Sequence, residues 1–570
     1  MILLNPRRLT KPHPDPRSAE VMRKTVEFFE TKGKVRLKQD YHARVWYADF
    51  LDFVRRERIF ATMCTPAGYG APDARWDTWR ICEFAELLGF YGLQYWYTWQ
   101  VSVLGLGPIW MSRNEALKQR AARALEEGGI FAFGLSEKEH GADIYSTDMT
   151  LVPVGEGRYL ANGRKYYIGN GNQAALVSTF GKLTGRGTGA GDYVFFAVEP
   201  RHERYELVQN VVASQNFVSE FALHDYPVSE ADILAKGQEA WDNALNTVNV
   251  GKFNLGWATI GICTHAFYEA IRHAANRRLY GMAVTDFGHV RRMFVDAYVR
   301  LVAMKLFALR AADYMRSASA ADRRYLLYNP MVKMKVTTQG EAVIDLMWDA
   351  IAAKGFEKDT YFEQAAVDIR ALPKLEGTVH VNIALIVKFM PGFFFAPADD
   401  LPEIPRRADA ANDDFLFAQG PTRGLGGIRF HDYRKTFAAW QLPNVALFAE
   451  QAEVFRAMLA AAPPDEAQRK DVDFLLAGGA LFALVVYAQL ILENARIYDV
   501  DPALVDQIFD VLVRDFSRHA VELHGRRAST APQMEAALRM IRKPIDDPVR
   551  YDRVWREMVL PMADAYEMNR

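Results

Sequence analysis

The first 130 residues alternate apolar and polar positions with the period of an α-helix. Apolar residues recur every three or four positions at 21–29 and 48–56, the spacing that places them on one helix face. Asn114 precedes the run Glu-Ala-Leu-Lys and is a residue type that caps helix N-termini. We therefore predict a helical domain over residues 1–130.

The pattern changes at residue 131. Short runs rich in β-branched and aromatic residues follow, separated by Gly, Asn and Asp turns, at residues 131–135, 149–154, 158–164, 176–180, 193–198 and 205–208. The glycine-rich run 185–191 precedes another strand-like run, whereas a phosphate-binding loop needs a helix after it, so we interpret it as a hairpin loop. A middle β domain is predicted over residues 131–239.

Helical periodicity returns at residue 240 and continues to residue 395. Residues 396–429 hold four prolines among charged and glycine residues, which is typical of a linker, and a second helical block covers residues 430–570. The predicted fold is therefore mainly α with a central β domain, in the order α-β-α, followed by a C-terminal helical bundle.

Residues 474–492 form a 19-residue apolar run in which Gln489 is the one clearly polar residue. The run is long enough to cross a bilayer. Acidic residues flank it, at Asp471, Asp473 and Glu493, and no basic cluster orients it. We predict a helix buried inside the C-terminal bundle, with a membrane-spanning helix as the alternative.

Composition narrows the functional classes. The chain has 570 residues, 69 Lys and Arg against 70 Asp and Glu, and half of its residues are hydrophobic, which excludes a disordered or fibrous protein. Because no long basic run occurs, we expect no nucleic-acid partner. Three widely spaced cysteines and the absence of H-E-x-x-H predict no disulfide framework and no metal centre, and the N-terminus shows no export signal, so a cytoplasmic location is expected.

Segments that occur in one order resemble the acyl-CoA dehydrogenase family. Residues 131–143 read FAFGLSEKEHGAD, similar to the family's aromatic strand, Ser/Thr-Glu and Gly-Ser-Asp turn. Residues 162–171 read NGRKYYIGNG, similar to Asn-Gly-x-Lys-x-Trp-Ile-Thr/Ser-Asn-Gly. Residues 375–378 read LEGT and match the Glu-Gly-Thr turn of the active site, and residues 276–281, NRRLYG, look like the Arg-x-x-Phe-Gly cofactor motif. The resemblance covers about residues 20–395.

This resemblance implies FAD-dependent dehydrogenation of an acyl-CoA thioester to a trans-2-enoyl-CoA. The family uses a carboxylate to remove the α proton on one side of the acyl chain, while flavin N5 takes the β hydride on the other. Glu376 matches the catalytic base, whose own backbone N–H holds the thioester oxygen together with a flavin hydroxyl. Some members carry the base on a neighbouring helix, but the matching position here is Gly251.

The resemblance also assigns cofactor contacts. The implied FAD-binding residues are Phe133, Leu135, Ser136, Tyr167, Gly169, Arg277, Tyr280, Thr378 and His380. The first three line the isoalloxazine ring, Tyr167 takes the place of a Trp beside it, and His380 stands where the family has a Gln or Asn-type partner. Thr378, Arg277 and Tyr280 meet the pyrophosphate and adenosine, the last two from a neighbouring subunit, which implies a homodimer or higher homo-oligomer. The alternatives are a β-core role for the aromatic strand residues and a solvated helix face for the arginine.

The sequence departs from the family at the cofactor site. Gly169 replaces a Thr or Ser whose hydroxyl bonds flavin N5, and Ala142 replaces the Ser of the Gly-Ser-Asp turn. The family's Gln-x-x-Gly-Gly stretch has Asp349 at its first position and Ala352-Ala353 at its last two. An acid near a diphosphate is unfavourable, so the dinucleotide end of FAD is expected to bind differently or weakly.

Residues 246–254 and 286–288 look more like the very-long-chain branch, which also carries a helical C-terminal extension. That likeness implies a long-chain acyl-CoA substrate, an electron-transfer flavoprotein as acceptor, and peripheral contact with the inner membrane. The alternatives are an acyl-CoA oxidase, in which oxygen reaches the reduced flavin, and a degenerate or non-catalytic flavoprotein subunit. A branch of the fold that protects DNA needs a basic surface, and the sequence shows no such cluster.

Overall fold

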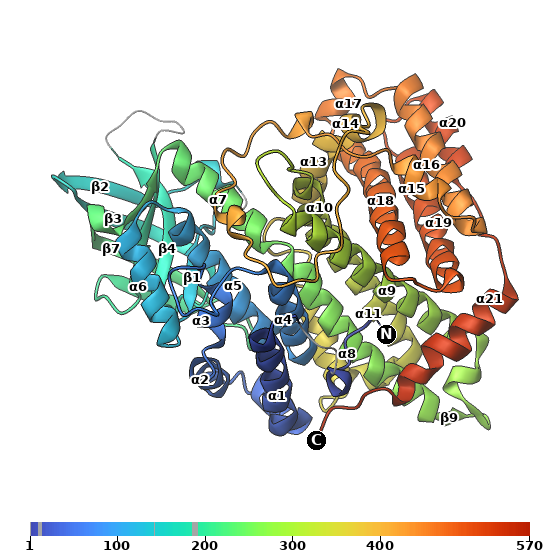
Figure 1. Ribbon diagram of the computed structural model, residues 1–570, viewed down its shortest axis with the longest axis horizontal. Coiled ribbons are helices and arrows are strands. Elements are labelled where there is room, and N and C mark those ends of the chain that lie inside the picture. Colours follow the sequence, from blue (N-terminus) through green and yellow to red (C-terminus); the bar gives the residue numbers. More distant parts are fainter. Residues whose placement is uncertain (1, 10–13, 142, 185–191) are drawn as a thin grey trace. The chain divides into compact units, whose positions relative to one another are not determined.

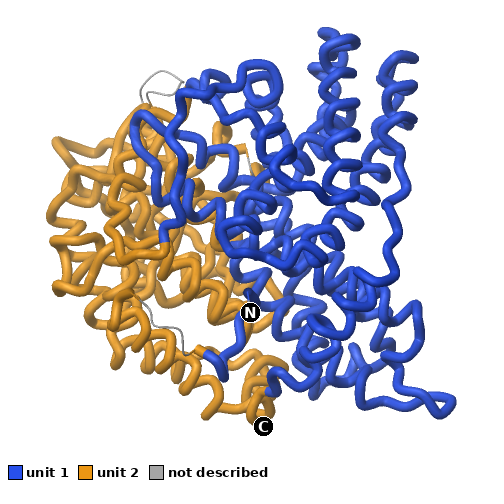
Figure 2. Tube along the Cα trace, turned by 45° about the vertical axis from the view of Figure 1, so that its right-hand side comes forward, with its two compact units in different colours: residues 1–8, 255–407, 424–567 blue, residues 9–254, 408–423, 568–570 orange. Residues whose placement is uncertain are grey.

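The structure is a computed structural model that describes residues 2–9, 14–141, 143–184 and 192–570. The glycine-rich run 185–191 and Ala142 lie outside the described residues, so the predictions made for them stay predictions. The chain forms two compact units (Figure 2). Unit 1 comprises Met1–Arg8, Leu255–Arg407 and Gly424–Glu567, and unit 2 comprises Leu9–Asn254, Ala408–Arg423 and Met568–Arg570.

Unit 2 is built on an eight-stranded sheet. Its strands are β1 (Phe131–Gly134), β2 (Thr150–Gly155), β3 (Arg158–Gly169), β4 (Leu176–Leu183), β5 (Tyr193–Val198), β6 (Tyr205–Asn210), β7 (Val218–Ser229) and β8 (Ile233–Lys236). The order is β6-β7-β3-β2-β4-β5-β8, and β1 pairs with β4 in parallel. All six strand-like runs predicted from the sequence form strands, so the central β domain is present.

Sequence patterning missed β7 and β8. Strand β7 pairs with both β3 and β6, yet it contains Glu220, His224, Asp225 and Pro227. Its first six residues are buried, whereas exposed and buried residues alternate in its second half. Both faces of the strand are buried in its first half and only one face in its second half. The alternation of apolar and polar residues that predicts a strand therefore does not extend along its whole length.

The N-terminal part of unit 2 consists of helices, and one more helix follows the sheet. They are α1 (Pro16–His42), α2 (Ala48–Arg56), α3 (Ile59–Cys64), α4 (Thr78–Tyr91), α5 (Leu93–Met111), α6 (Glu115–Glu126) and, after the sheet, α7 (Gln238–Gly251). The side chain of Asn114 accepts a hydrogen bond from the backbone N–H of Leu117 at 3.0 Å, so the predicted cap of α6 is confirmed. Helix α5 is buried along nearly its whole length and packs on β1, α4 and α7.

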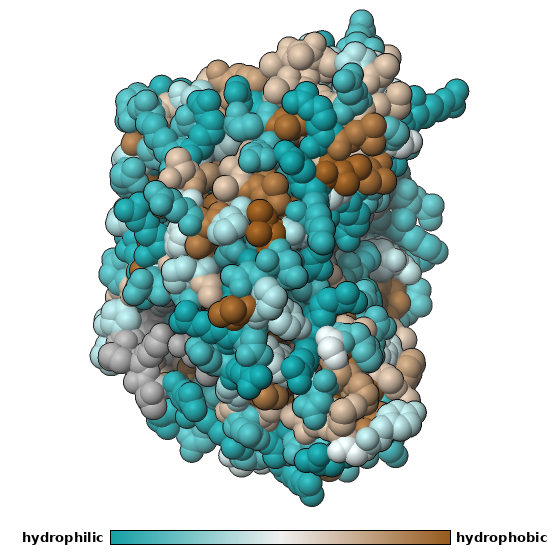
Figure 3. Space-filling view, turned by 90° about the vertical axis from the view of Figure 1, so that its right-hand side faces the viewer, coloured by the Kyte–Doolittle hydropathy of each residue, from teal (hydrophilic) through white to brown (hydrophobic). Residues whose placement is uncertain are grey.

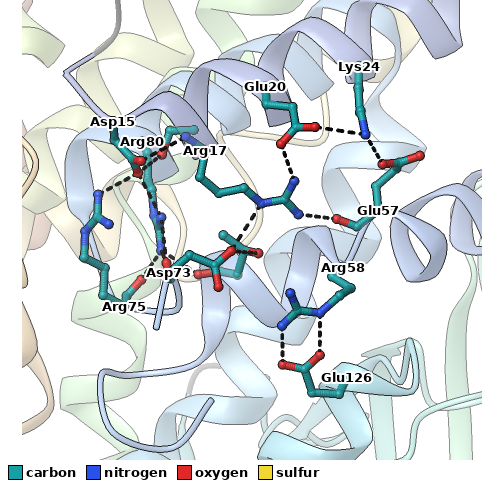
Figure 4. Close-up of polar contacts among 12 residues, drawn as sticks. Asp15, Arg17, Glu20, Lys24, Glu57, Arg58, Asp73, Arg75, Arg80 and Glu126 are labelled. Atoms are coloured by element: carbon teal, nitrogen blue, oxygen red, sulfur yellow. Dashed lines mark hydrogen bonds and ion pairs between the residues drawn. The ribbon is translucent and has the colours of Figure 1, made fainter. Parts of the chain in front are cut away.

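Charged side chains join α1 to the loop before α4, and the N-cap residue of α3 to α6, within unit 2 (Figure 4). Arg17 on α1 pairs with Glu20 at 2.8 Å and with Asp73 at 3.2 Å. The guanidinium of Arg58, which precedes α3, donates from Nε and Nη2 to the two oxygens of Glu126 on α6, each at 2.8 Å. Bidentate pairs of this kind fix the geometry of both partners, so they orient α6 just before the chain enters β1.

Unit 1 is almost entirely helical. Its core elements are α8 (Asn254–Asn276), the hairpin β9 (Arg278–Leu279) and β10 (Met282–Ala283), α9 (Gly288–Arg316), α10 (Tyr325–Met331), a π-helical segment (Val332–Val336), α11 (Thr337–Ile351), α12 (Tyr361–Asp368), α13 (Val379–Ile386) and α14 (Met390–Phe395). The C-terminal elements are α15 (Tyr433–Ala438), α16 (Pro443–Ala461), α17 (Glu466–Lys470), α18 (Val472–Ile497), α19 (Pro502–His524), α20 (Ala531–Met540) and α21 (Pro548–Arg553).

Helix α18 contains the apolar run of residues 474–492. Among the described residues it is the one helix long and apolar enough to cross a membrane, yet 78% of its most apolar window is buried inside the protein. It packs against α9, α13 and α19 of unit 1, and Figure 1 shows it beside α19. Its polar residues also have protein partners: Asn494 Nδ2 donates to the carbonyl of Leu306 at 2.8 Å, and Glu493 pairs with Arg310. These contacts favour the buried-helix prediction, because polar side chains of α18 find their partners inside the protein, and lipid offers none.

Candidate active site

The predicted base lies in a strained turn between α12 and α13 in unit 1. Glu376 has φ +51° and Gly377 has φ +85°, so both adopt the left-handed conformation. Glycine tolerates this conformation. For a glutamate the conformation is strained by about 1–3 kcal/mol, so it persists only where contacts with the surrounding structure hold it. The Glu-Gly-Thr motif therefore folds here into a tight turn with two successive residues in the left-handed conformation.

Helix α13 and its first residues anchor the turn. Thr378 is the N-cap of α13, and its Oγ1 accepts a hydrogen bond from the backbone N–H of Val381 at 3.3 Å. Asn382 Nδ2 donates to the carbonyls of Gly377 at 3.1 Å and Thr378 at 2.9 Å. Glu376 itself is half-buried, and its Oε2 is shielded from solvent. The turn is thus fastened to the helix that follows it.

The alternative base position is closed by packing in unit 2. A Cβ on Gly251 would lie 2.6 Å from Leu104 Cδ2 and 3.0 Å from Gln100 Nε2, both on α5. The same Gln100 Nε2 donates to the carbonyl of Gly251 at 3.0 Å. Position 251 thus holds a glycine in tight contact with α5 and offers no carboxylate, so Glu376 remains the predicted base.

In unit 2, the end of β1 is locked to β3 next to the predicted flavin residues. Ser136 Oγ donates to the carbonyl of Tyr166 at 2.8 Å, and the N–H of Tyr166 donates to the carbonyl of Ser136 at 3.0 Å. The Phe133 ring stacks on Phe195 with ring centroids 6.0 Å apart. Phe133, Leu135 and Ser136 are all half-buried, so they combine a fixed backbone with partly accessible side chains.

Tyr167 and Gly169 follow on β3. Tyr167 has φ +63° and its side chain is 59% exposed, which makes it an accessible ring at the end of the sheet. A Cβ on Gly169 would lie 2.6 Å from Tyr97 Cε1 and 2.7 Å from Val101 Cγ1. The phenol of Tyr97 therefore occupies the space that a Thr or Ser at position 169 would need. The departure at position 169 is matched by a bulky neighbour that the sequence motif did not reveal.

The predicted dinucleotide residues are exposed in unit 1. Tyr280 is 94% exposed at the tip of the β9–β10 hairpin, and Arg277 is exposed at its base. Thr378 and His380 are also exposed. This placement leaves their side chains available to a ligand. The exposure of Arg277 fits both the predicted cofactor role and the alternative of a solvated surface, so both stay open.

The residues replacing the family's Gln-x-x-Gly-Gly stretch lie at the end of α11. Asp349 is exposed, and Ala352, the C-cap, has φ +51°. An alanine thus adopts a conformation that a glycine would adopt without strain. The predicted change in binding at the dinucleotide end stays a prediction.

Sequence reasoning missed two buried lysines near the predicted site residues. Lys165 on β3 is fully buried and binds Glu137 at 2.7 Å and the carbonyl of Leu135 at 3.0 Å. Burial lowers the pKa of Lys165 to about 8, against the opposing attraction of Glu137. In unit 1, Lys333 is also fully buried, beneath the Glu376 turn. The available signal was a lysine inside an otherwise apolar run, as in Pro-Met-Val-Lys-Met.

Residues 239–390 match the family model described as acyl-CoA dehydrogenase, C-terminal domain. The predicted resemblance to the acyl-CoA dehydrogenase family is confirmed. The chain is 24% identical to the caffeyl-CoA reductase-Etf complex subunit CarC of Acetobacterium woodii, over 56% of this chain and 84% of that protein. It is 25% identical to an acyl-CoA dehydrogenase of Bacillus subtilis, over 51% of this chain and 76% of that protein.

The fold agrees with this family along the whole chain. The crystal structure of an acyl-CoA dehydrogenase complexed with FAD from Bacillus anthracis superposes with a TM-score of 0.73 at 16% identity, covering 98% of this chain and 97% of that chain. That coverage includes the C-terminal helices, so the predicted α-β-α fold with a C-terminal helical region is confirmed.

Each unit, taken by itself, offers groups among its described residues that suit part of FAD. The exposed ring of Tyr167 suits an aromatic ring system, and the exposed guanidinium of Arg277 suits a pyrophosphate. The hydroxyls of Ser136 in unit 2 and of Thr378 in unit 1 are further polar groups that suit the cofactor. The exposed carboxylate of Asp349 is the one feature among the implied FAD contacts that opposes a phosphate.

Proposed function

We propose that the protein is an FAD-dependent acyl-CoA dehydrogenase that converts a long-chain saturated acyl-CoA to its trans-2-enoyl thioester. The likeness to the acyl-CoA dehydrogenase family supports oxidoreductase activity and FAD. The observation that carries the proposal is the strained Glu376–Gly377 turn, which is built into the head of α13. A strained backbone persists only where the surrounding structure holds it, and such residues are concentrated at functional sites.

Glu376 would accept the α proton of the thioester at a carboxylate oxygen. FAD, when bound, supplies the acceptor for the β hydride. The shielding of Oε2 limits its contact with water, and a dry carboxylate is a stronger base than a hydrated one. The turn is attached to α13 by hydrogen bonds, which restricts the positions of the carboxylate. Restricting a catalytic group in this way raises the rate of proton transfer.

The proposed electron acceptor is an electron-transfer flavoprotein. Support comes from the printed name of the CarC relative, which is a subunit of a complex with such a protein. The same name describes a reductase, so the chain's substrate preference is best determined with both saturated alkyl and aryl-propanoyl thioesters. The long-chain preference and a homo-oligomeric state are likewise proposals, supported by the likeness to the very-long-chain branch and by the exposed hairpin.

A visible spectrum of the purified chain tests the proposal. We expect a yellow protein whose flavin absorbance is bleached anaerobically by palmitoyl-CoA, and more slowly by butyryl-CoA and 3-phenylpropanoyl-CoA. Fastest bleaching by either of the last two thioesters would replace the long-chain assignment. Oxygen consumption equal to the acyl-CoA added would make the protein an oxidase. A colourless protein that also fails to take up added FAD would overturn the proposal and favour a degenerate subunit.

A further inference from the structure

The Glu376 turn rests on a buried cation in unit 1. Lys333 has no exposed surface, and its Nζ donates to the carbonyl of Pro373 at 2.7 Å and to the carbonyl of Gly377. These two carbonyls lie four residues apart, one on each side of Glu376. A single ammonium group therefore holds both ends of the turn.

A buried ammonium group needs acceptors for its three N–H groups, and the carbonyls of Pro373 and Gly377 provide two of them. Lys333 therefore gains its solvation from this turn. The turn depends on the lysine in return. The carbonyl of Gly377 accepts hydrogen bonds from Lys333 Nζ and from Asn382 Nδ2, the latter at 3.1 Å, and the two donors fix its direction. With this carbonyl fixed, the peptide between Gly377 and Thr378, which adjoins the Glu376 residue's own turn, cannot rotate freely.

Lys333 lies in the π-helical segment Val332–Val336 between α10 and α11. Segments of this kind are rare and recur at functional sites. Here the segment sends two lysines into different surroundings: Lys333 reaches the Glu376 turn, whereas Lys335 lies 5.6 Å from the ring centre of Tyr487 on α18. The π-helical segment thus connects the turn with the C-terminal bundle of the same unit.

We propose that Lys333 is a positioning residue for Glu376, and that its ammonium holds the Glu376–Gly377 turn in the left-handed conformation that aims the carboxylate. This role rests on the proposed function, in which Glu376 is the base. Lys333 does not touch the reacting atoms. Its effect is to keep the carboxylate within the small range of positions from which it can take the α proton.

The test compares Lys333→Met, which removes the donor, with Lys333→Arg, which keeps a cation and its N–H groups. Lys374→Met is the matched control, because Lys374 adjoins the turn but its side chain is 60% exposed and pairs with Glu341 at the surface. In holoprotein, we expect Lys333→Met to retain FAD and to bind palmitoyl-CoA within threefold of the parent. Its anaerobic bleaching should slow by about 10²-fold, the loss typical of a misplaced catalytic group. Lys333→Arg should recover part of the rate, and Lys374→Met should match the parent.

Amide hydrogen exchange separates this role from the proposed function. We expect residues 374–380 to exchange at least tenfold faster in Lys333→Met than in the parent, while peptides from α9 and α18 keep their protection. This result would support the positioning role even if the parent protein showed no bleaching, in which case the proposed function alone would fail. If Lys333→Met does not fold, Lys333→Gln, which keeps a donor for one carbonyl, takes its place in both measurements. Unchanged exchange in residues 374–380 together with an unchanged bleaching rate would overturn the proposal.

Discussion

The Glu376 turn and the β9–β10 hairpin hold a non-glycine residue in the same unfavourable conformation but support it in opposite ways. Glu376 has φ +51° and Tyr280 has φ +52°. In the turn, Lys333 and Asn382 both donate to the carbonyl of Gly377, below the surface of unit 1. In the hairpin, the two short strands pair through their backbones and the Tyr280 side chain is 94% exposed.

The difference indicates how each element would work. The turn is held by side chains of its own chain, so its geometry is set before any ligand arrives. The hairpin presents Tyr280 outward, and the resemblance assigns this residue and Arg277 to the FAD of a neighbouring subunit. Preorganisation is therefore expected at the base, and dependence on a ligand or a second copy is expected at the hairpin.

The largest expected effect is at the turn itself. Glu376→Gln preserves the shape of the side chain and removes the base, so anaerobic bleaching by palmitoyl-CoA should slow by about 10²–10⁴-fold while bound FAD and thermal stability stay unchanged. Stopped-flow absorbance of the flavin measures this rate. Tyr280→Phe, which keeps the hairpin backbone and an aromatic ring, is the control and should bleach within twofold of the parent. Bleaching by Glu376→Gln at the parent rate would show that another group takes the proton.

A smaller effect is expected beneath α13, the helix to which the turn is attached. A Cβ on Gly479 of α18 would lie 2.3 Å from Ile383 Cγ2 and 2.9 Å from Val387 Cγ1, whereas one on Gly478 would meet no atom within 4 Å. Gly479→Ala should therefore lower the free energy of unfolding by about 1–3 kcal/mol through overpacking. Gly478→Ala should raise it by up to about 1 kcal/mol, because alanine favours the helix.

Urea unfolding followed by circular dichroism compares the two alanine variants. The pair isolates contact from helix propensity, because both changes add the same methyl group to neighbouring positions of one helix. Equal stability of the two variants would mean that α18 does not press on α13. In that case the turn would owe its support to Lys333 and Asn382 rather than to the C-terminal bundle.

Much of the fold could be predicted from periodicity. The helical N-terminal region, six strands and the helical C-terminal block all follow from local patterns that the tertiary structure preserves. Strand β7 could not be predicted in this way, because its burial changes from both faces to one along its length. The boundaries between the five predicted segments stay predictions. The two compact units divide the chain differently, since residues 408–423 of the predicted linker belong to unit 2.

The site was predictable where a motif is contiguous and not where it depends on packing. Residues 375–378 identified the turn, but no local pattern shows that Lys333 lies under it, more than 40 positions earlier. Likewise, Gly169 was recognised as a departure, whereas the phenol of Tyr97 that fills its side-chain space comes from a distant helix. Contacts between residues far apart in the chain carry no local sequence signal.

A further prediction concerns Lys335, on the side of the π-helical segment that faces α18. Burial lowers the pKa of Lys335 to about 8, although Asp515 attracts its charge while Arg300 and Arg518 repel it and Glu522 attracts it. Below pH 8 the folded and unfolded states are both protonated, so the cost of burying the charge is fully present. Between pH 8 and about 10.5 the unfolded state holds a proton that the folded state has lost, so stability rises with pH.

Lys335→Met removes this titration and the cation–π contact with Tyr487 together. We expect the variant to be more stable than the parent by about 1 kcal/mol at pH 7, after allowance for the lost contact, with the difference shrinking as the pH rises from 8 to 10. Urea unfolding at pH 7, 8 and 9.5 measures it. Arg496→Met, a substitution on the exposed end of α18, serves as the control and should show a constant difference from the parent. A constant difference for Lys335→Met as well would mean that the lysine does not titrate in this range.

The smallest effect on stability is expected at the hairpin. Tyr280→Asn removes an exposed ring and places a residue that tolerates positive φ at the tip, so the free energy of unfolding should change by no more than about 0.5 kcal/mol. Retention of FAD after gel filtration, measured as the ratio of absorbance at the flavin band to that of the protein, should fall, because the ring would no longer meet the cofactor. The roles of the turn and the hairpin would then be distinguishable. Changes at the turn alter the rate of flavin bleaching with FAD bound, and changes at the hairpin alter how much FAD is bound. A loss of several kcal/mol in Tyr280→Asn would mean instead that the ring packs within the assembled protein and that its exposure in the single chain is covered by a second copy.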